Sequence, residues 1–140
     1  MKISLILKKK LKKFDYDKLS EECGVFGISN HEDASALVAL GLHALQHRGQ
    51  EGCGIVSFDG KNYHSEKRQG LVGDHFTNPK TLKNLPGNFA IGHNRYSTTG
   101  ETSLRNIQPF FADLHVGGLS IAHNGNLTNA LALRENLVKD

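Results

Sequence analysis

The chain has 140 residues, of which 38% are hydrophobic and three are proline, a composition typical of a folded domain and not of a disordered chain. Seven of the 17 basic residues and four of the 14 acidic residues lie in residues 1–22, which leaves ten of each from residue 23 onward. Because this body is neutral, we expect no nucleic-acid partner, which would require a basic surface patch.

Residues 1–22 form a lysine-rich segment that only superficially looks like a secretory signal. Its apolar run, residues 3–7, is shorter than the ~7–15 residues of a signal core, and lysines follow it. No stretch of the chain approaches the ~20 apolar residues that cross a membrane, so we predict no membrane partner. Two interpretations stay open for residues 1–22: a solvated tail, or a leader that is removed during maturation.

The first half of the body predicts a strand, a helix and a hairpin. Residues 24–29, GVFGIS, are apolar and glycine-spaced, which favours a short strand that another backbone or a ligand approaches closely. Apolar residues then recur with helical spacing over 34–46. A strand at 53–58, an Asp59-Gly60 turn and a return strand near 62–67 complete a predicted hairpin.

The second half predicts a short helix from Pro79, a strand within 88–98, strands at 110–113 and 117–123, and a final helix. Leu127, Leu131, Arg134 and Val138 share one side of that helix. The order of elements favours a mostly antiparallel, layered α+β domain over a doubly wound parallel sheet. The final helix has no glycine at its C-terminus, so we expect the 140 residues to be part of a larger domain.

Two weaker patterns suggest other sites. His43 and His47 are four residues apart on the predicted helix, but no HExxH pattern accompanies them, so surface or packing histidines are favoured and no metal site is predicted. The glycines of GQEGCGI do not match a phosphate-binding loop. Two cysteines without zinc or disulfide spacing indicate free thiols in a reducing cytoplasm.

Cys23 is a candidate nucleophile, because a thiolate attacks carbonyl carbons when a nearby base or positive field lowers its pKa. If Cys23 became the first residue, its own α-amino group would lie within one residue of the sulfur as that base. The alternative is a buried structural cysteine at a strand edge.

Two polar stretches look suited to a negatively charged group. In HNRYSTTG, Arg95 leaves a predicted strand, and its guanidinium can hold a carboxylate through two parallel hydrogen bonds. In AHNGN, the Asn124 amide and a backbone N–H of the turn at Gly125 can stabilise an oxyanion. The alternatives are a surface arginine and an ordinary Asn-Gly turn.

The motifs CGVFGI, LQHRGQEGCGI, GHNRYSTTG, NIQPF and AHNGNLTN occur in an order that resembles the glutaminase domain of the amidophosphoribosyltransferase family. The resemblance covers residue 23 to about 137. It implies an N-terminal-nucleophile hydrolase with a four-layer αββα sandwich of antiparallel sheets, incomplete at its C-terminus. Residues 1–22 would be a leader, and residues 23–140 a truncated type 2 glutamine amidotransferase domain.

The resemblance also implies a role for each site residue. Cys23 would attack the glutamine side chain with its α-amino group as base, and Asn124 and Gly125 would form the oxyanion hole. Arg95 would bind the α-carboxylate of glutamine, with Tyr96 and Thr98 lining the site. The loop His47-Arg48-Gly49-Gln50 would lie near the site, without an assigned role.

In this family the ammonia reacts with phosphoribosylpyrophosphate in a phosphoribosyltransferase domain that these 140 residues lack, at the first step of purine synthesis. The resemblance implies no cofactor in this segment, magnesium in that other domain, and a homo-oligomeric full-length enzyme. Some members carry an iron–sulfur cluster, and no residue of this chain indicates whether one is present. One alternative is the glutaminase domain of glucosamine-6-phosphate synthase or asparagine synthetase, although the motifs NIQPF and NGNLTN favour the amidophosphoribosyltransferase family. The other alternative is an inactive scaffold.

Overall fold

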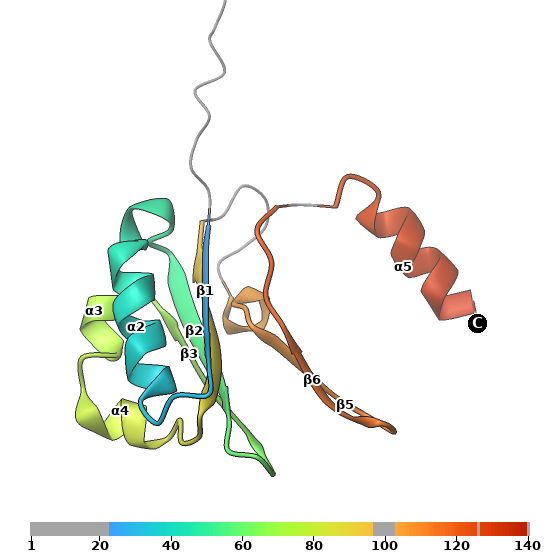
Figure 1. The fold of residues 1–140 in the computed structure, drawn as a ribbon. Helices are drawn as coiled ribbons and strands as arrows, with labels where there is room; N and C mark the ends of the chain where they lie inside the picture. The colour runs from blue at the N-terminus through green and yellow to red at the C-terminus, as the bar shows by residue number, and fades with distance from the viewer. Residues whose placement is uncertain (1–22, 97–102, 126, 140) are drawn as a thin grey trace, which may run out of the picture.

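A computed structural model describes residues 23–96, 103–125 and 127–139 (Figure 1). The predicted leader, residues 1–22, and the predicted site residue Thr98 lie outside these ranges. Within them, no helix is long and apolar enough to cross a membrane.

A four-stranded antiparallel sheet forms the centre of the molecule. Its spatial order is β1 (Gly24–Ser29), β4 (Phe89–Arg95), β2 (Gly52–Phe58) and β3 (Tyr63–Gln69). The predicted strand at 24–29 and the predicted hairpin are confirmed. The turn of the hairpin forms because the Asp59 carboxylate accepts hydrogen bonds from the backbone N–H groups of Lys61 and Asn62, as Asp side chains commonly do in turns.

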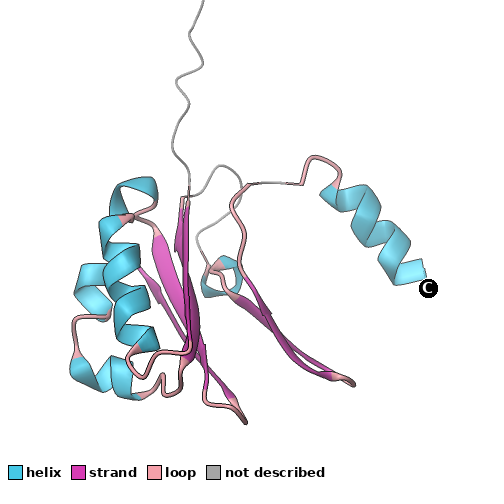
Figure 2. Cartoon of the chain, viewed as in Figure 1, coloured by secondary structure: helices cyan, strands magenta, loops and turns pink. Residues whose placement is uncertain are grey.

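Three helices cover one face of this sheet: α2 (Ala34–Ala44), α3 (Val72–His75) and α4 (Pro79–Lys83) (Figure 2). The core lies between α2 and the sheet, and Val38, Leu42 and Ile55 are fully buried there. Burial of each such side chain stabilises the fold by about 1.5–3 kcal/mol. Gly92 allows α2 to approach β4, since a Cβ at this position would lie 2.6 Å from Leu42 Cδ1.

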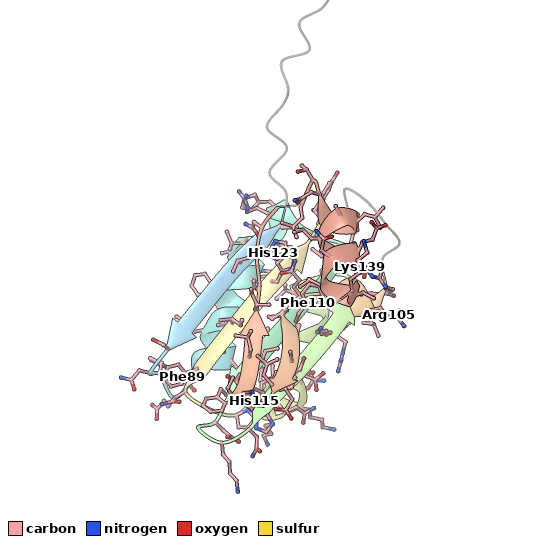
Figure 3. The ribbon with its side chains drawn as sticks, turned by 90° about the vertical axis from the view of Figure 1, so that its right-hand side faces the viewer. Phe89, Arg105, Phe110, His115, His123 and Lys139 are labelled. Carbon is pink, nitrogen blue, oxygen red and sulfur yellow. The ribbon has the colours of Figure 1, made fainter. Side chains whose placement is uncertain are left out.

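A second, two-stranded sheet lies on the opposite face. The hairpin of β5 (Phe110–Leu114) and β6 (Gly117–Ile121) faces the larger sheet, and α5 (Ala130–Lys139) lies beyond it (Figures 1 and 3). The Tyr63 hydroxyl joins the sheets by donating to the Gly118 carbonyl at 3.0 Å. The order of layers is therefore helix, sheet, sheet, helix, and the predicted α+β class with an αββα sandwich is confirmed.

The structure differs from the sequence prediction at three element boundaries. The predicted helix 34–46 ends at Ala44 and is followed by the 3₁₀ helix η1 (Gln46–Arg48), where Arg48 N–H bonds to the Leu45 carbonyl. The predicted strand 117–123 ends at Ile121, because the His123 N–H turns away to the Gln108 side chain. The four-residue helix α3 was not predicted, since one turn is too short to show a period.

Helix α5 is present as predicted, but its apolar side is not buried within the described residues. Leu131 and Val138 are 71% and 78% exposed, and Leu127, just before the helix, is also exposed. The stability of the described fold thus rests on the layer between α2 and the larger sheet.

Candidate active site

The antiparallel register of β1 and β4 brings Cys23 beside the end of β4. Gly24 is paired with Asn94, the residue before Arg95, so Cys23 lies next to the end of β4. The Cys23 thiol can donate to the Tyr96 carbonyl at 3.6 Å, and the Tyr96 N–H donates to Sγ at 3.4 Å. The backbone of Tyr96 therefore holds the half-buried sulfur of Cys23. The resemblance implies only that Tyr96 lines the site.

The backbone of Cys23 is fixed by a residue to which the sequence assigned no role. Nε of Arg48, at the end of η1, donates to the Cys23 carbonyl at 2.7 Å. Cys23 itself has a φ of 59°, a left-handed conformation that is uncommon for residues other than glycine. The only sequence signal for this contact was the position of Arg48 in the HRGQ loop.

Gly49 explains how η1 reaches the site. A Cβ on Gly49 would lie 2.7 Å from the backbone carbon of Arg95 and 2.8 Å from its oxygen, which is closer than real Cβ atoms approach. The Glu51 N–H then donates to the same Arg95 carbonyl at 3.2 Å. The glycine thus lets the HRGQ loop lie directly on the last residue of β4, next to Cys23.

Arg95 is half-buried where β4 ends. Its Nη1 donates to the Asn106 carbonyl at 3.0 Å, which ties it to the 3₁₀ helix η2 (Leu104–Asn106). A guanidinium has five N–H donors in a planar fork, so an arginine anchored in this way can also bind a carboxylate. The structure thus places Arg95 and Cys23 at the same end of the central sheet, and the carboxylate-binding role of Arg95 stays a prediction.

Asn124 and Gly125 follow β6. They lie at one end of the second sheet, the end that is nearest the start of β1. Figure 3 labels the preceding residue, His123. The Gln108 side chain fixes this segment by accepting the His123 N–H at 2.7 Å. Gly125 has a φ of 112°, which glycine adopts readily. Among the described residues, no hydrogen bond joins Asn124 or Gly125 to Cys23, so their predicted roles rest on their place at this end of the molecule.

The second cysteine differs sharply from the first. Cys53 on β2 is fully buried in the core, and burial raises the pKa of its thiol to about 12. A thiol with such a pKa is inert as a nucleophile at neutral pH. The half-buried Cys23 is therefore the candidate for thiol chemistry.

The weaker histidine pattern is not supported by the geometry. His43 lies on α2 and His47 on η1, so the two do not share one continuous helix. In the part of the chain that the structure describes, no three His, Cys, Asp or Glu side chains are grouped as metal ligands would be.

Comparison with known proteins defines the class. The model of the family "Glutamine amidotransferases class-II" matches residues 23–138, and the chain belongs to this family. Its curated relatives include the amidophosphoribosyltransferase of Rhizobium etli, 66% identical over 89% of this chain, and the chloroplastic amidophosphoribosyltransferase 3 of Arabidopsis thaliana, 54% identical over 86%. The chain spans about a quarter of the length of these relatives, 25% and 23% respectively.

Solved structures agree with this assignment. A structure described as the allosteric regulatory enzyme of purine biosynthesis matches with a TM-score of 0.76 and 46% identity, over 82% of this chain and 25% of that one. The glutamine phosphoribosylpyrophosphate amidotransferase of B. subtilis matches with a TM-score of 0.73, also at 46% identity, over 82% of this chain and 24% of that one. At this identity the likeness extends to the family as well as the fold.

Proposed function

We propose that this chain is the glutaminase part of an amidophosphoribosyltransferase, in which Cys23 hydrolyses the side-chain amide of glutamine. The observation that carries the proposal is the register that brings Cys23 to the end of β4, where Arg95 lies, with its sulfur against the backbone of Tyr96. A nucleophile and a carboxylate-binding fork then lie side by side, as an amino-acid substrate requires. The names of the curated relatives support the same activity.

We propose that Cys23 becomes the first residue when residues 1–22 are removed. Its α-amino group, with an ordinary pKa of ~7.7–8.0, then serves as the base. The backbone of Cys23 supports such a cut, because a φ of 59° costs a residue with a side chain about 1–2 kcal/mol. Breaking the peptide bond before Cys23 abolishes this dihedral angle and with it the strain.

The proposed reaction has two halves. The thiol proton passes to the α-amino group, and Sγ attacks the side-chain carbonyl carbon of glutamine. The N–H groups of Asn124 and Gly125 stabilise the oxyanion, and the proton on the amine is given to the leaving ammonia as the C–N bond breaks. Water then hydrolyses the thioester, which releases glutamate and restores the thiol. Arg95 holds the α-carboxylate, with Tyr96 and Thr98 lining the site.

The acceptor of the ammonia is proposed to be phosphoribosylpyrophosphate, as the relatives' names suggest. These relatives are about three and a half times as long as this chain, and we assign the acceptor chemistry, with its magnesium, to that additional length. We assign no residue of the 140 to magnesium or to an iron–sulfur cluster. We further propose a cytoplasmic location, since Cys23 and Cys53 are free thiols. A homo-oligomeric full-length enzyme is proposed from the resemblance to the family alone.

Intact-mass measurement together with a glutaminase assay tests the proposal. The expressed protein should lose residues 1–22 and convert glutamine to glutamate, and Cys23→Ser should abolish this turnover. Cys53→Ala is the matched control, because it removes the other thiol, which is fully buried in the core against α2, and it should stay active. Normal glutamine hydrolysis by a protein in which Cys23 remains internal would overturn the mechanism.

A further inference from the structure

His93 is a buried histidine between the two sheets, two residues before Arg95, the end of β4 that forms the candidate site. Its neighbours Gly92 and Asn94 face the other way, since Gly92 packs under Leu42 and the Asn94 amide donates to the Leu42 carbonyl at 2.6 Å. Because side chains alternate along a strand, His93 faces the hairpin of β5 and β6. Its side chain is 1% exposed.

The polar groups around the His93 ring are those of the candidate site. The ring is near enough to the backbone and imidazole of His123, and to the Arg95 guanidinium, for each of them to act on its pKa. Burial, the His123 imidazole and the Arg95 guanidinium lower that pKa to about 4, although the His123 backbone acts to raise it, so the ring is neutral at pH 7 and offers one donor and one acceptor. Neither ring nitrogen completes a hydrogen bond of normal geometry with the described residues.

The backbone of His123 is thus approached by two side chains. The buried Gln108 accepts its N–H at 2.7 Å. Gln108 is itself fixed, because its carbonyl lies directly over Gly54, where a Cβ would not fit. His93 lies against the same backbone from β4. The residue that follows His123 is Asn124, so these two contacts determine where the Asn124-Gly125 turn begins.

We propose that His93 is a positioning residue for the proposed glutaminase reaction, whose neutral ring bonds the His123 backbone and so aims the Asn124 and Gly125 N–H groups at the oxyanion. This inference rests on the proposed function and adds a residue on the central sheet to it. An unpaired imidazole in a dry interface is costly. A hydrogen bond between the ring and the His123 backbone would satisfy it and would fix where the turn begins.

The experiment compares three variants of the complete protein. His93→Leu removes both ring nitrogens, whereas His93→Asn and His93→Gln place an amide N–H near the positions of Nδ1 and Nε2 respectively. His93→Leu should lower kcat for glutamine hydrolysis by about tenfold or more, as the loss of an oxyanion donor does, with KM within about twofold. One of the two amide variants should restore at least about a third of the wild-type kcat.

Alkylation of Cys23 by iodoacetamide distinguishes a role in oxyanion binding from a purely structural role, because a general disruption of the site would also slow alkylation. This displacement forms no oxyanion, so its rate in His93→Leu should stay within about twofold of wild type while kcat falls. A parallel loss of alkylation, or an equal rise in KM, would mean that the site as a whole had collapsed, and would refute a role confined to the oxyanion turn.

Ile91→Ala is the matched control. Ile91 lies on the same face of β4, two residues from His93, and lines an apolar cavity of about 220 Å³ with Leu119 and Tyr63. Its truncation loosens the packing between the sheets without touching His123, so kcat should not change. The proposal fails if Ile91→Ala lowers kcat as much as His93→Leu, if His93→Leu keeps the wild-type kcat, or if neither amide variant restores activity. A wild-type protein without glutaminase activity would instead refute the proposed function, and the inference with it.

Discussion

Arg48 and Cys23 are 25 residues apart in sequence, and Nε of Arg48 donates to the Cys23 carbonyl at 2.7 Å. The bond joins the end of η1 to the residue just before β1 and leaves the thiol of Cys23 beside Tyr96. A hydrogen bond from a charged donor contributes about 1.5–3 kcal/mol. Arg48 therefore holds Cys23, the proposed nucleophile, in place from outside β1.

Replacing Arg48 with methionine should lower kcat/KM for glutamine hydrolysis by about 10- to 100-fold, which corresponds to the loss of that bond. The reason is that no hydrogen bond from Arg48 would then hold the backbone carbonyl of Cys23. Steady-state kinetics provide the measurement. Arg134→Met, which removes the same charge from the exposed helix α5, is the control and should be neutral. Equal effects of the two variants would show that only net charge matters.

Arg95→Lys tests the carboxylate site. Lysine keeps the charge but loses the planar fork and, with it, the geometry of the bond that Nη1 makes to the Asn106 carbonyl. The KM for glutamine should rise by about tenfold or more, with a smaller change in kcat. An unchanged KM would remove Arg95 from the substrate site.

The fold could be predicted largely from the sequence because its signals are local. The Asp59-Gly60 turn, the short apolar run of β2 and the proline at the start of α4 each act within a few residues. Helix α3 and the helix η1 could not be predicted, because they depend on long-range bonds. The Gln46 side chain, for example, accepts the Val72 N–H across 26 residues.

The site was predictable only in part, for the same physical reason. Cys23 and Arg95 belong to short motifs that indicate their chemistry. The contacts of Arg48 and His93 arise from strand register and from the packing of one sheet on another, and neither is written in any local pattern. The residues proposed to orient the reacting groups are therefore the part of this site that only the three-dimensional structure identifies.

The two thiols should react very differently. Because burial raises the pKa of Cys53 to about 12, iodoacetamide at pH 7.5 should modify only Cys23 in the native protein. Both should react in urea. Mass spectrometry of the digested protein gives the site of each adduct. Modification of Cys53 in the native protein would contradict its place in the core.

Gly49→Ala should reduce glutaminase activity severely. The added Cβ would lie 2.7 Å from the Arg95 backbone carbon, so either η1 or the end of β4 must shift, and the two carry Arg48 and Arg95. Gly73→Ala is the matched control, since its Cβ would meet only ordinary contacts at 3.5 Å in α3. If Gly49→Ala were as active as Gly73→Ala, the HRGQ loop would be able to shift without loss of activity.

The stability of the protein should fall in mild acid because His93 is buried as the neutral base. Its pKa is about 4 in the folded state, against about 6.5 when unfolded. The unfolded chain therefore binds the proton first, and this stabilisation is fully present above pH 6.5 and lost as the pH falls towards 4. A difference of this size corresponds to about 3 kcal/mol in the free energy of unfolding. The groups that oppose the charge are His123 and Arg95.

Urea unfolding followed by circular dichroism, at pH 7, 5.5 and 4.5, measures this dependence. In His93→Gln the free energy of unfolding should fall less between pH 6.5 and pH 4 than in the wild type, since one titrating group has been removed. His115→Gln is the control, because His115 is exposed at the turn of the β5–β6 hairpin (Figure 3), and its pH dependence should match the wild type. A wild-type pH dependence in His93→Gln would show that His93 is not held neutral by the fold, because a histidine that charges as readily folded as unfolded contributes nothing to the slope.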